Sequence, residues 1–124
     1  MNNLSVKLVL KIITINLFIV IFVYNSYAGG EKQNHDLMKA QDSVAQLASK
    51  FYAEGNYRKT LDLIAVNDSI LFSPKLFYYY GMSYATLYDY QKAQEYFKKA
   101  IHKDSTNVHY HFQFGRLLMQ AGFS

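Results

Sequence analysis

The segment from Pro74 to Asn107 constrains the fold more than any other part of the chain. Its apolar and small residues recur at the spacing of an α-helix on both sides of a central break, which predicts two consecutive amphipathic helices. Gly81 and Ala93 leave space for the two helix backbones to approach closely. Tyr84 and Phe97 supply the bulk between them. We therefore expect a helical hairpin with one solvated face and one apolar face that needs a neighbour.

The order of these residues also matches a known repeat pattern. Counted from Pro74, the segment reads aromatic-x2-apolar-Gly-x2-Tyr, then Ala nine positions later, then x3-Phe and x2-Ala. This pattern resembles the tetratricopeptide repeat (TPR). Phe77 stands where the family usually has Trp, Tyr80 where it has Leu, and Ser105 where it has Pro. The remaining packing positions match the family, and they are Gly81, Tyr84, Ala93, Phe97 and Ala100.

The segment before the central repeat, residues 41–73, is interpreted as a degenerate first repeat. Its first helix is expected over residues 36–54 and is ended by Gly55. The second helix is expected over residues 57–70, and it should pack loosely or fray early because Thr60 replaces a small Ala. The inward-facing residues of the two helices are predicted to be Leu37, Ala40, Val44, Leu47, Ala48, Phe51, Leu61, Ile64 and Ala65.

The segment after the central repeat, residues 108–124, is predicted to be the first helix of a third repeat. Gly115 follows Gly81 at the TPR repeat length, and Phe114 and Leu118 take the flanking packing positions. The resemblance thus implies an all-α fold of antiparallel helical hairpins, stacked as a short right-handed α-solenoid of about 2.5 repeats.

One side of the last helix would remain exposed in such a stack. Burial of apolar surface is worth about 25 cal/mol per Å², so 200 to 300 Å² left in water forfeits roughly 5 to 7 kcal/mol. We expect a second copy of the chain, a partner helix or a continuation of the chain to cover this side. The alternative is a marginally stable truncated product.

The N-terminal segment, residues 1–28, has the pattern of a signal peptide. Lys7 and Lys11 give it a positive start, and the 13 residues Ile12–Tyr24 are uncharged and mostly apolar. The triplet Ser26–Ala28 places small residues where a signal peptidase reads the chain. Cleavage after Ala28 is the resulting prediction.

An uncleaved membrane anchor is the alternative interpretation. Thirteen helical residues span only about 20 Å of the roughly 30 Å hydrocarbon layer, which favours cleavage. Counted back through Lys11 to Leu8, however, the run has 17 residues. Under both interpretations the rest of the chain is periplasmic or extracellular, with residues 29–35 as a flexible leader and residues 36–124 as the helical domain.

Composition excludes several kinds of chemistry. The chain has no cysteine, so disulfides, thiolate metal sites and cysteine nucleophiles are ruled out. Its formal net charge of +4 falls to about +2 once Lys7 and Lys11 leave with the signal, which is too small to indicate nucleic-acid binding.

The candidate catalytic and metal-binding residues have simpler structural explanations. Residues 81–85 read G-x-S-x-A, but a nucleophile elbow needs a strand and a strained turn under Ser83, and both flanks are predicted to be helical. His109 and His111 are two residues apart, whereas a zinc pair on a helix needs three or four. His111 is interpreted as a core residue at an aromatic position of the family. We expect no catalysis, no metal and no cofactor.

The TPR resemblance also implies a binding groove on the concave face of the solenoid. The residues that the family pattern places there are Lys75, Tyr78, Met82 and Thr86 from the central repeat, and His109, Phe112, Arg116 and Gln120 from the last helix. Tyrosine gives contact area at low entropy cost, and methionine adapts its shape. Such a groove suits an extended or helical peptide with apolar anchors and an acid for Lys75 or Arg116. The alternative is that these are ordinary surface residues.

The expected function is a non-catalytic scaffold that binds a peptide or a partner protein outside the cytoplasm. The alternative is a structural assembly subunit, or a fragment of a longer TPR protein. In that case self-association or a continuation of the chain completes the last helix. Contact with a membrane is expected only if the N-terminal segment is uncleaved.

Overall fold

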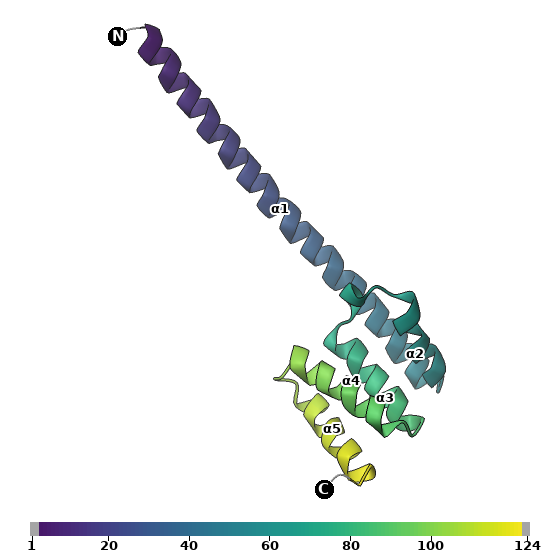
Figure 1. Ribbon diagram of the computed structural model, residues 1–124. Coiled ribbons are helices and arrows are strands. Elements are labelled where there is room, and N and C mark those ends of the chain that lie inside the picture. Colours follow the sequence, from purple (N-terminus) through teal and green to yellow (C-terminus); the bar gives the residue numbers. More distant parts are fainter. Residues whose placement is uncertain (1–2, 123–124) are drawn as a thin grey trace. The chain divides into compact units, whose positions relative to one another are not determined.

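The computed structural model describes residues 3–122 and is all-helical over that range (Figure 1). The described residues form five α-helices and no strand, and 87% of them are helical, so the predicted all-α class is confirmed. The chain divides into two compact units between Leu37 and Met38. In order, the elements are α1 (Asn3–Ala53), α2 (Tyr57–Val66), the 3-10 helix η1 (Ser69–Leu71), α3 (Pro74–Thr86), α4 (Tyr90–Lys103) and α5 (Val108–Gln120).

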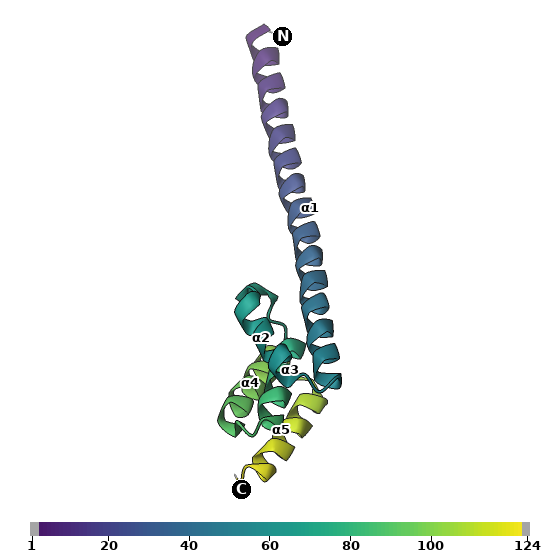
Figure 2. The same ribbon diagram turned by 90° about the vertical axis from the view of Figure 1, so that its right-hand side faces the viewer.

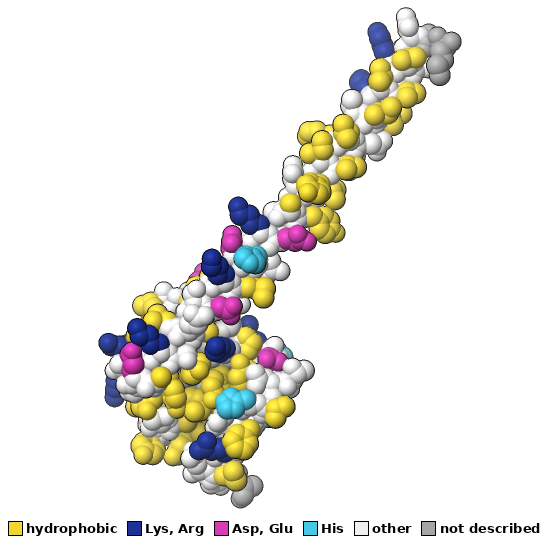
Figure 3. All heavy atoms as spheres, turned by 180° about the vertical axis from the view of Figure 1, so that it is seen from behind, with side chains coloured by type: hydrophobic (Ala, Val, Ile, Leu, Met, Phe, Trp, Pro, Cys, Tyr) yellow, Lys and Arg dark blue, Asp and Glu magenta, His cyan; other side chains and the backbone are white. Residues whose placement is uncertain are grey.

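The first unit is the N-terminal part of α1, and its apolar side chains are exposed (Figure 3). This helix is long and apolar enough to cross a membrane, a test that a signal sequence also passes. Its two central polar side chains bond to their own helix. Thr14 Oγ1 donates to the Lys11 carbonyl at 2.8 Å, and Asn16 Nδ2 donates to the Ile12 carbonyl at 3.0 Å.

Residues 29–35, predicted to be a flexible leader, are helical in the full chain. No proline interrupts the backbone hydrogen bonds of this stretch, and Gly29 and Gly30 each cost only about 1 kcal/mol relative to alanine in a helix. Flexibility of these residues after removal of residues 1–28 remains a prediction.

The second unit begins with the C-terminal part of α1 and continues with α2. Ala48 and Thr60 are fully buried here, so Thr60 occupies the small-residue site predicted for it. Leu63 is buried as well, although the pattern did not select it. The predictions for Leu47 and Ala65 are wrong, because both are exposed. Each lies two residues, about 200° around the helix, from the buried residues Ala45 and Leu63.

The helix α2 ends at Val66, four residues before the predicted end. The side chain of Asn67 donates to the Leu63 carbonyl at 2.9 Å, and the chain then turns into η1. This early end agrees with the expectation that the second helix frays early.

Helices α3 and α4 pack against each other, and α2 and α5 lie against α3 and α4 respectively (Figures 1 and 2). Ser73 caps α3 by accepting from the Leu76 amide at 3.2 Å, and Asp89 caps α4 by accepting from the Lys92 amide at 3.2 Å. Both side chains satisfy amides that a helix end leaves free.

Helix α3 lies in close contact with α4 at Gly81. A Cβ atom built on this glycine would lie 3.0 Å from Cδ2 of Phe97 in α4. Phe77, Tyr80, Ala93 and Ala100 complete the buried contact. Tyr84 is half-buried and stacks on Tyr96, with ring centroids 5.5 Å apart and an interplanar angle of 11°.

Helix α5 packs against α4. Tyr110 and Leu117 are buried, and the half-buried Phe114 lies with its ring centroid 6.2 Å from that of Phe97. The prediction of His111 as a core residue is wrong, because it is exposed and its ring bonds to the Ser105 carbonyl at 2.9 Å. Its neighbour in sequence, Tyr110, fills the core instead.

The packing positions predicted at Gly115 and Leu118 are only half-buried. A Cβ atom on Gly115 would meet nothing within 4 Å, so this glycine lacks the close contact that Gly81 makes. Phe123, which the sequence places among the apolar residues expected on the exposed side of the last helix, lies outside the described residues.

Left-handed backbone conformations recur along the second unit. Gly55 (φ 76°), Tyr88 (φ 64°) and Gly122 (φ 76°) stand at nearly equal intervals, and each comes after the end of a helix. Tyr88 is the non-glycine member, and its Cβ makes this conformation costly.

Candidate functional site

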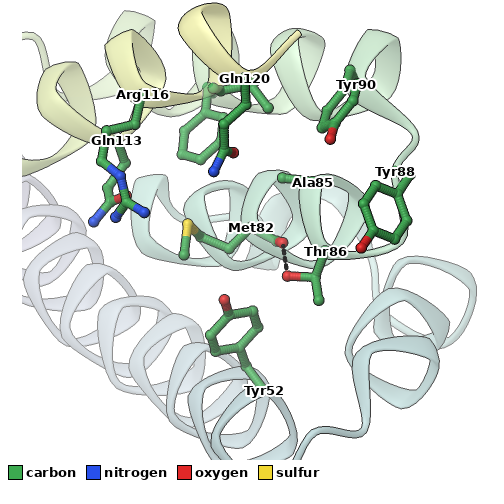
Figure 4. Close-up of a pocket in the computed structure, with 11 residues that line it drawn as sticks. Tyr52, Met82, Ala85, Thr86, Tyr88, Tyr90, Gln113, Arg116 and Gln120 are labelled. Atoms are coloured by element: carbon green, nitrogen blue, oxygen red, sulfur yellow. Dashed lines mark hydrogen bonds between the residues drawn. The ribbon is translucent and has the colours of Figure 1, made fainter.

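One hollow in the second unit is a groove of about 430 Å³ between α3 and α5 (Figure 4). Tyr52 at the end of α1 contributes one wall, and the turn from α3 to α4 contributes another. Figure 4 places Gln113 and Arg116 next to each other at one end and Tyr88 and Tyr90 at the other. The lining residues are Tyr52, Met82, Ala85, Thr86, Tyr88, Tyr90, Phe97, Gln113, Arg116, Leu117 and Gln120.

Four of the eight predicted partner-binding residues line this groove. Met82 and Thr86 reach it from α3, and Arg116 and Gln120 reach it from α5. Met82 and Thr86 are four residues apart, as are Arg116 and Gln120, so each pair lies on one face of its helix. Half of the residues that the family pattern placed on the concave face therefore line one hollow.

The prediction for Tyr78 is wrong, because this side chain is only 8% exposed and belongs to the core. Its ring stacks on Tyr110 with centroids 5.2 Å apart, and its hydroxyl bonds to His109 Nε2 at 2.9 Å. Burial raises the pKa of Tyr78 to about 12, with smaller contributions from Tyr79, Tyr52 and Tyr110. Tyr78 holds α3 against α5 and does not present itself to a partner.

The other three predicted residues lie outside the lining of the groove. Lys75 is exposed at the start of α3, Phe112 is 60% exposed on α5, and His109 is held by Tyr78. Only Arg116 therefore brings a positive charge to the groove.

Sequence reasoning missed several lining residues. Gln113 could have been found, because it lies three residues before Arg116 and seven before Gln120, on the same face of α5. Tyr88 and Tyr90 could not have been found from helical spacing, because Tyr88 lies in the turn after α3 and Tyr90 is the first residue of α4. Tyr52 comes from the end of α1 and lies next to Tyr79 in α3, with ring centroids 5.8 Å apart.

The polar groups of the groove are partly engaged with each other. Arg116 Nη1 donates to Gln113 Oε1 at 3.2 Å, which orients the guanidinium. Thr86 Oγ1 donates to the Met82 carbonyl at 2.9 Å, so its lone pairs remain available as acceptors (Figure 4). The salt bridges within residues 3–122 involve other side chains, and no described carboxylate pairs with Arg116.

The candidate nucleophile and the candidate metal ligands are not arranged for those roles in the part of the chain that is described. Ser83 is fully buried inside α3, and no substrate can reach its hydroxyl. Over residues 3–122, histidine and acidic side chains form no group of three that could hold a metal ion. The arrangement can bind a chain by contact area, hydrogen bonds and one positive charge.

Comparison of the chain with models of known protein families, with curated proteins and with solved structures finds no match in any of the three. The function therefore has to be argued from the residues and their geometry.

Proposed function

We propose that this chain is a non-catalytic interaction module of the TPR type, whose groove between α3 and α5 binds a peptide or an unstructured segment of a partner protein. The proposed arrangement is a short right-handed solenoid of about 2.5 helical hairpins. Residues 1–28 are proposed to export the module, so that it acts in the periplasm or outside the cell.

The observation that carries this proposal is the recurrence of helix boundaries at the TPR period. Helix α2 begins at Tyr57 and α4 at Tyr90, while α3 begins at Pro74 and α5 at Val108. The left-handed residues Gly55, Tyr88 and Gly122 follow nearly the same interval. A repeated period of about 34 residues in helix pairs is typical of TPR solenoids.

The composition of the groove supports peptide binding over catalysis. Its walls combine aromatic and amide side chains with Met82, whose unbranched side chain adapts to different shapes. Tyrosine-rich surfaces gain contact area without ordering many rotatable bonds. The volume of about 430 Å³ accommodates a few side chains of a peptide and lies within the range of ligand sites.

Selection of peptides from an unbiased displayed library tests the proposal. The full chain in mild detergent serves as bait, and binding of the selected peptides is then measured on Met82→Lys and His102→Ala variants. Met82→Lys places a charge in the middle of the groove, whereas His102 is exposed on α4 outside its lining. We expect Met82→Lys to abolish binding and His102→Ala to leave it unchanged. Failure to select any peptide, or equal binding by both variants, would refute the proposal.

A second candidate is an assembly subunit, and the surface of α5 favours it. Val108, Phe112 and Met119 are 78%, 60% and 74% exposed and follow each other at helical spacing beside the open site at Gly115. A second copy packed on this face would bury them. Light scattering should then find a dimer for the wild type and a monomer for Phe112→Ser with Met119→Ser. A monomeric wild type at micromolar concentration would eliminate this candidate.

A further inference from the structure

The charge of the groove narrows the class of peptides that it can bind. Arg116 is the only charged residue among the eleven lining residues, and neither Asp nor Glu is among them. A ligand that covers this guanidinium without supplying an anion would leave a positive charge poorly solvated, which is costly.

The guanidinium is also held in position before any ligand arrives. Its Nη1 atom donates to Gln113 Oε1 at 3.2 Å, which uses one of five N–H donors. The remaining donors form the planar fork that carboxylates accept in pairs. Because Gln113 is itself neutral, it orients Arg116 without cancelling its charge.

The position of Arg116 along α5 indicates where the anion lies in the ligand. Gln113, Arg116 and Gln120 follow each other at intervals of three and four residues, so they form one stripe along the helix. Gln120 extends this stripe beyond Arg116 on one side, and Gln113 extends it on the other. A bound chain that contacts the stripe therefore continues in both directions from the residue opposite Arg116.

The wall across from Arg116 favours an apolar neighbour in the ligand. Met82 lies between Arg116 and Tyr52 in Figure 4, and its side chain donates no hydrogen bond. In an extended peptide, side chains two residues apart point to the same side and lie about 7 Å apart, close enough for one to meet the charge and the other the methionine.

We propose that the groove recognises an internal aspartate or glutamate side chain, which pairs with Arg116 while a nearby apolar side chain packs on Met82 and Tyr52. This inference rests on the proposed peptide-binding function and narrows its ligands to acidic segments. The anion that pairs with Arg116 is then a side-chain carboxylate inside the bound segment and not the carboxylate at the end of a chain.

Three matched peptide libraries test the inference on the full chain in mild detergent. The first has a central Glu between random flanks and blocked termini, the second has Gln at that position, and the third has central Gln with a free C-terminal carboxylate. We expect the wild type to retain the Glu library about tenfold better than either other library, because a hydrogen bond to a charged group strengthens binding by about tenfold.

Variants then assign the preference to Arg116. Arg116→Gln should reduce the Glu-to-Gln ratio to about one, and Arg116→Lys should keep part of it, because the charge stays while the fork is lost. Gln113→Ala should lower the ratio severalfold by releasing the guanidinium. Lys98→Gln removes an equal charge from the exposed face of α4, outside the groove, and should change nothing.

The possible outcomes distinguish the acidic preference from the proposed peptide-binding function. Equal retention of the Glu and Gln libraries would overturn the acidic preference and leave peptide binding intact. Stronger retention of the third library would assign Arg116 to a chain terminus and overturn the inference as well. Retention of no library at all would refute peptide binding itself.

Discussion

The contact between Gly81 and Phe97 provides the sharpest test of the helical packing. A Cβ atom at residue 81 would lie 3.0 Å from Phe97 Cδ2 and 3.2 Å from both Cε2 and Cγ. These are ring atoms of a side chain that is only 1% exposed, so the ring has little room to retreat. Larger residues at position 81 must therefore push α3 away from α4.

The magnitude of the effect depends on the size of the new side chain. Overpacking of a core costs about 1 to 3 kcal/mol, whereas replacing a helical glycine by alanine returns up to about 1 kcal/mol. Gly81→Ala is therefore expected to lower the free energy of unfolding by about 0 to 2 kcal/mol. Gly81→Leu adds three further carbons at the same contact and should cost about 3 kcal/mol or more.

Gly115 is the matched control, because it takes the position of Gly81 in the repeat pattern and its Cβ would meet nothing within 4 Å. Gly115→Ala should therefore stabilise the protein by up to about 1 kcal/mol. Near-ultraviolet circular dichroism of the 12 tyrosines reports the melting of the core. A change of about 1 kcal/mol corresponds to a shift of about 4 to 8 °C in Tm for a domain of this size. An unmoved Tm in Gly81→Leu would refute the close helix approach.

Four further perturbations follow from buried or capping residues. Asp89→Ala removes the cap of α4 and should cost about 1 kcal/mol in chemical denaturation. Leu117→Ala empties a site that is 3% exposed and should cost about 2 to 5 kcal/mol, whereas Leu47→Ala, at a 40% exposed site, should cost far less. The folded-state pKa of Tyr78 is raised to about 12 from 10.0, so the unfolded chain loses this proton first and stability should fall between about pH 10 and pH 12. The buried Tyr80 hydroxyl has no hydrogen-bond partner, so Tyr80→Phe should leave stability at neutral pH unchanged or raise it by about 1 kcal/mol. Because burial also raises the pKa of Tyr80, the variant should lose less stability at alkaline pH. A destabilised Tyr80→Phe would contradict this account.

The sequence predicted the central hairpin well because its signals are local and agree with each other. Ser73 and Asp89 mark helix starts through their capping side chains, and Gly81 and Phe97 mark the packed face through their size. Each of these features depends on a few neighbouring residues. The all-α class follows from the same local signals.

The sequence was less informative where two nearby residues competed for one buried site. Tyr110 and His111 are adjacent, and the repeat pattern chose His111, while the protein buries the larger and less polar Tyr110. Tyr78 was assigned to the groove by the same pattern. Its position opposite Tyr110 made it part of the core, a contact between α3 and α5 that no single-helix period contains.

The candidate groove was predicted only in part for a similar reason. The family pattern assigns positions on the faces of α3 and α5, and it included Met82, Thr86, Arg116 and Gln120. The residues that close the groove come from helix ends and turns, whose positions depend on the tertiary fold. Tyr52 and Tyr88 belong to this group.

At position 88, the stability of the left-handed backbone and the lining of the groove favour different residues. Glycine occupies the corresponding turns at positions 55 and 122, and a tyrosine there gives up about 1 kcal/mol or more of conformational free energy. Yet the phenol ring of Tyr88 forms part of the groove, and glycine would remove it. A mutant library screened only for heat resistance should thus accumulate glycine at position 88, whereas one screened for ligand capture should retain an aromatic residue.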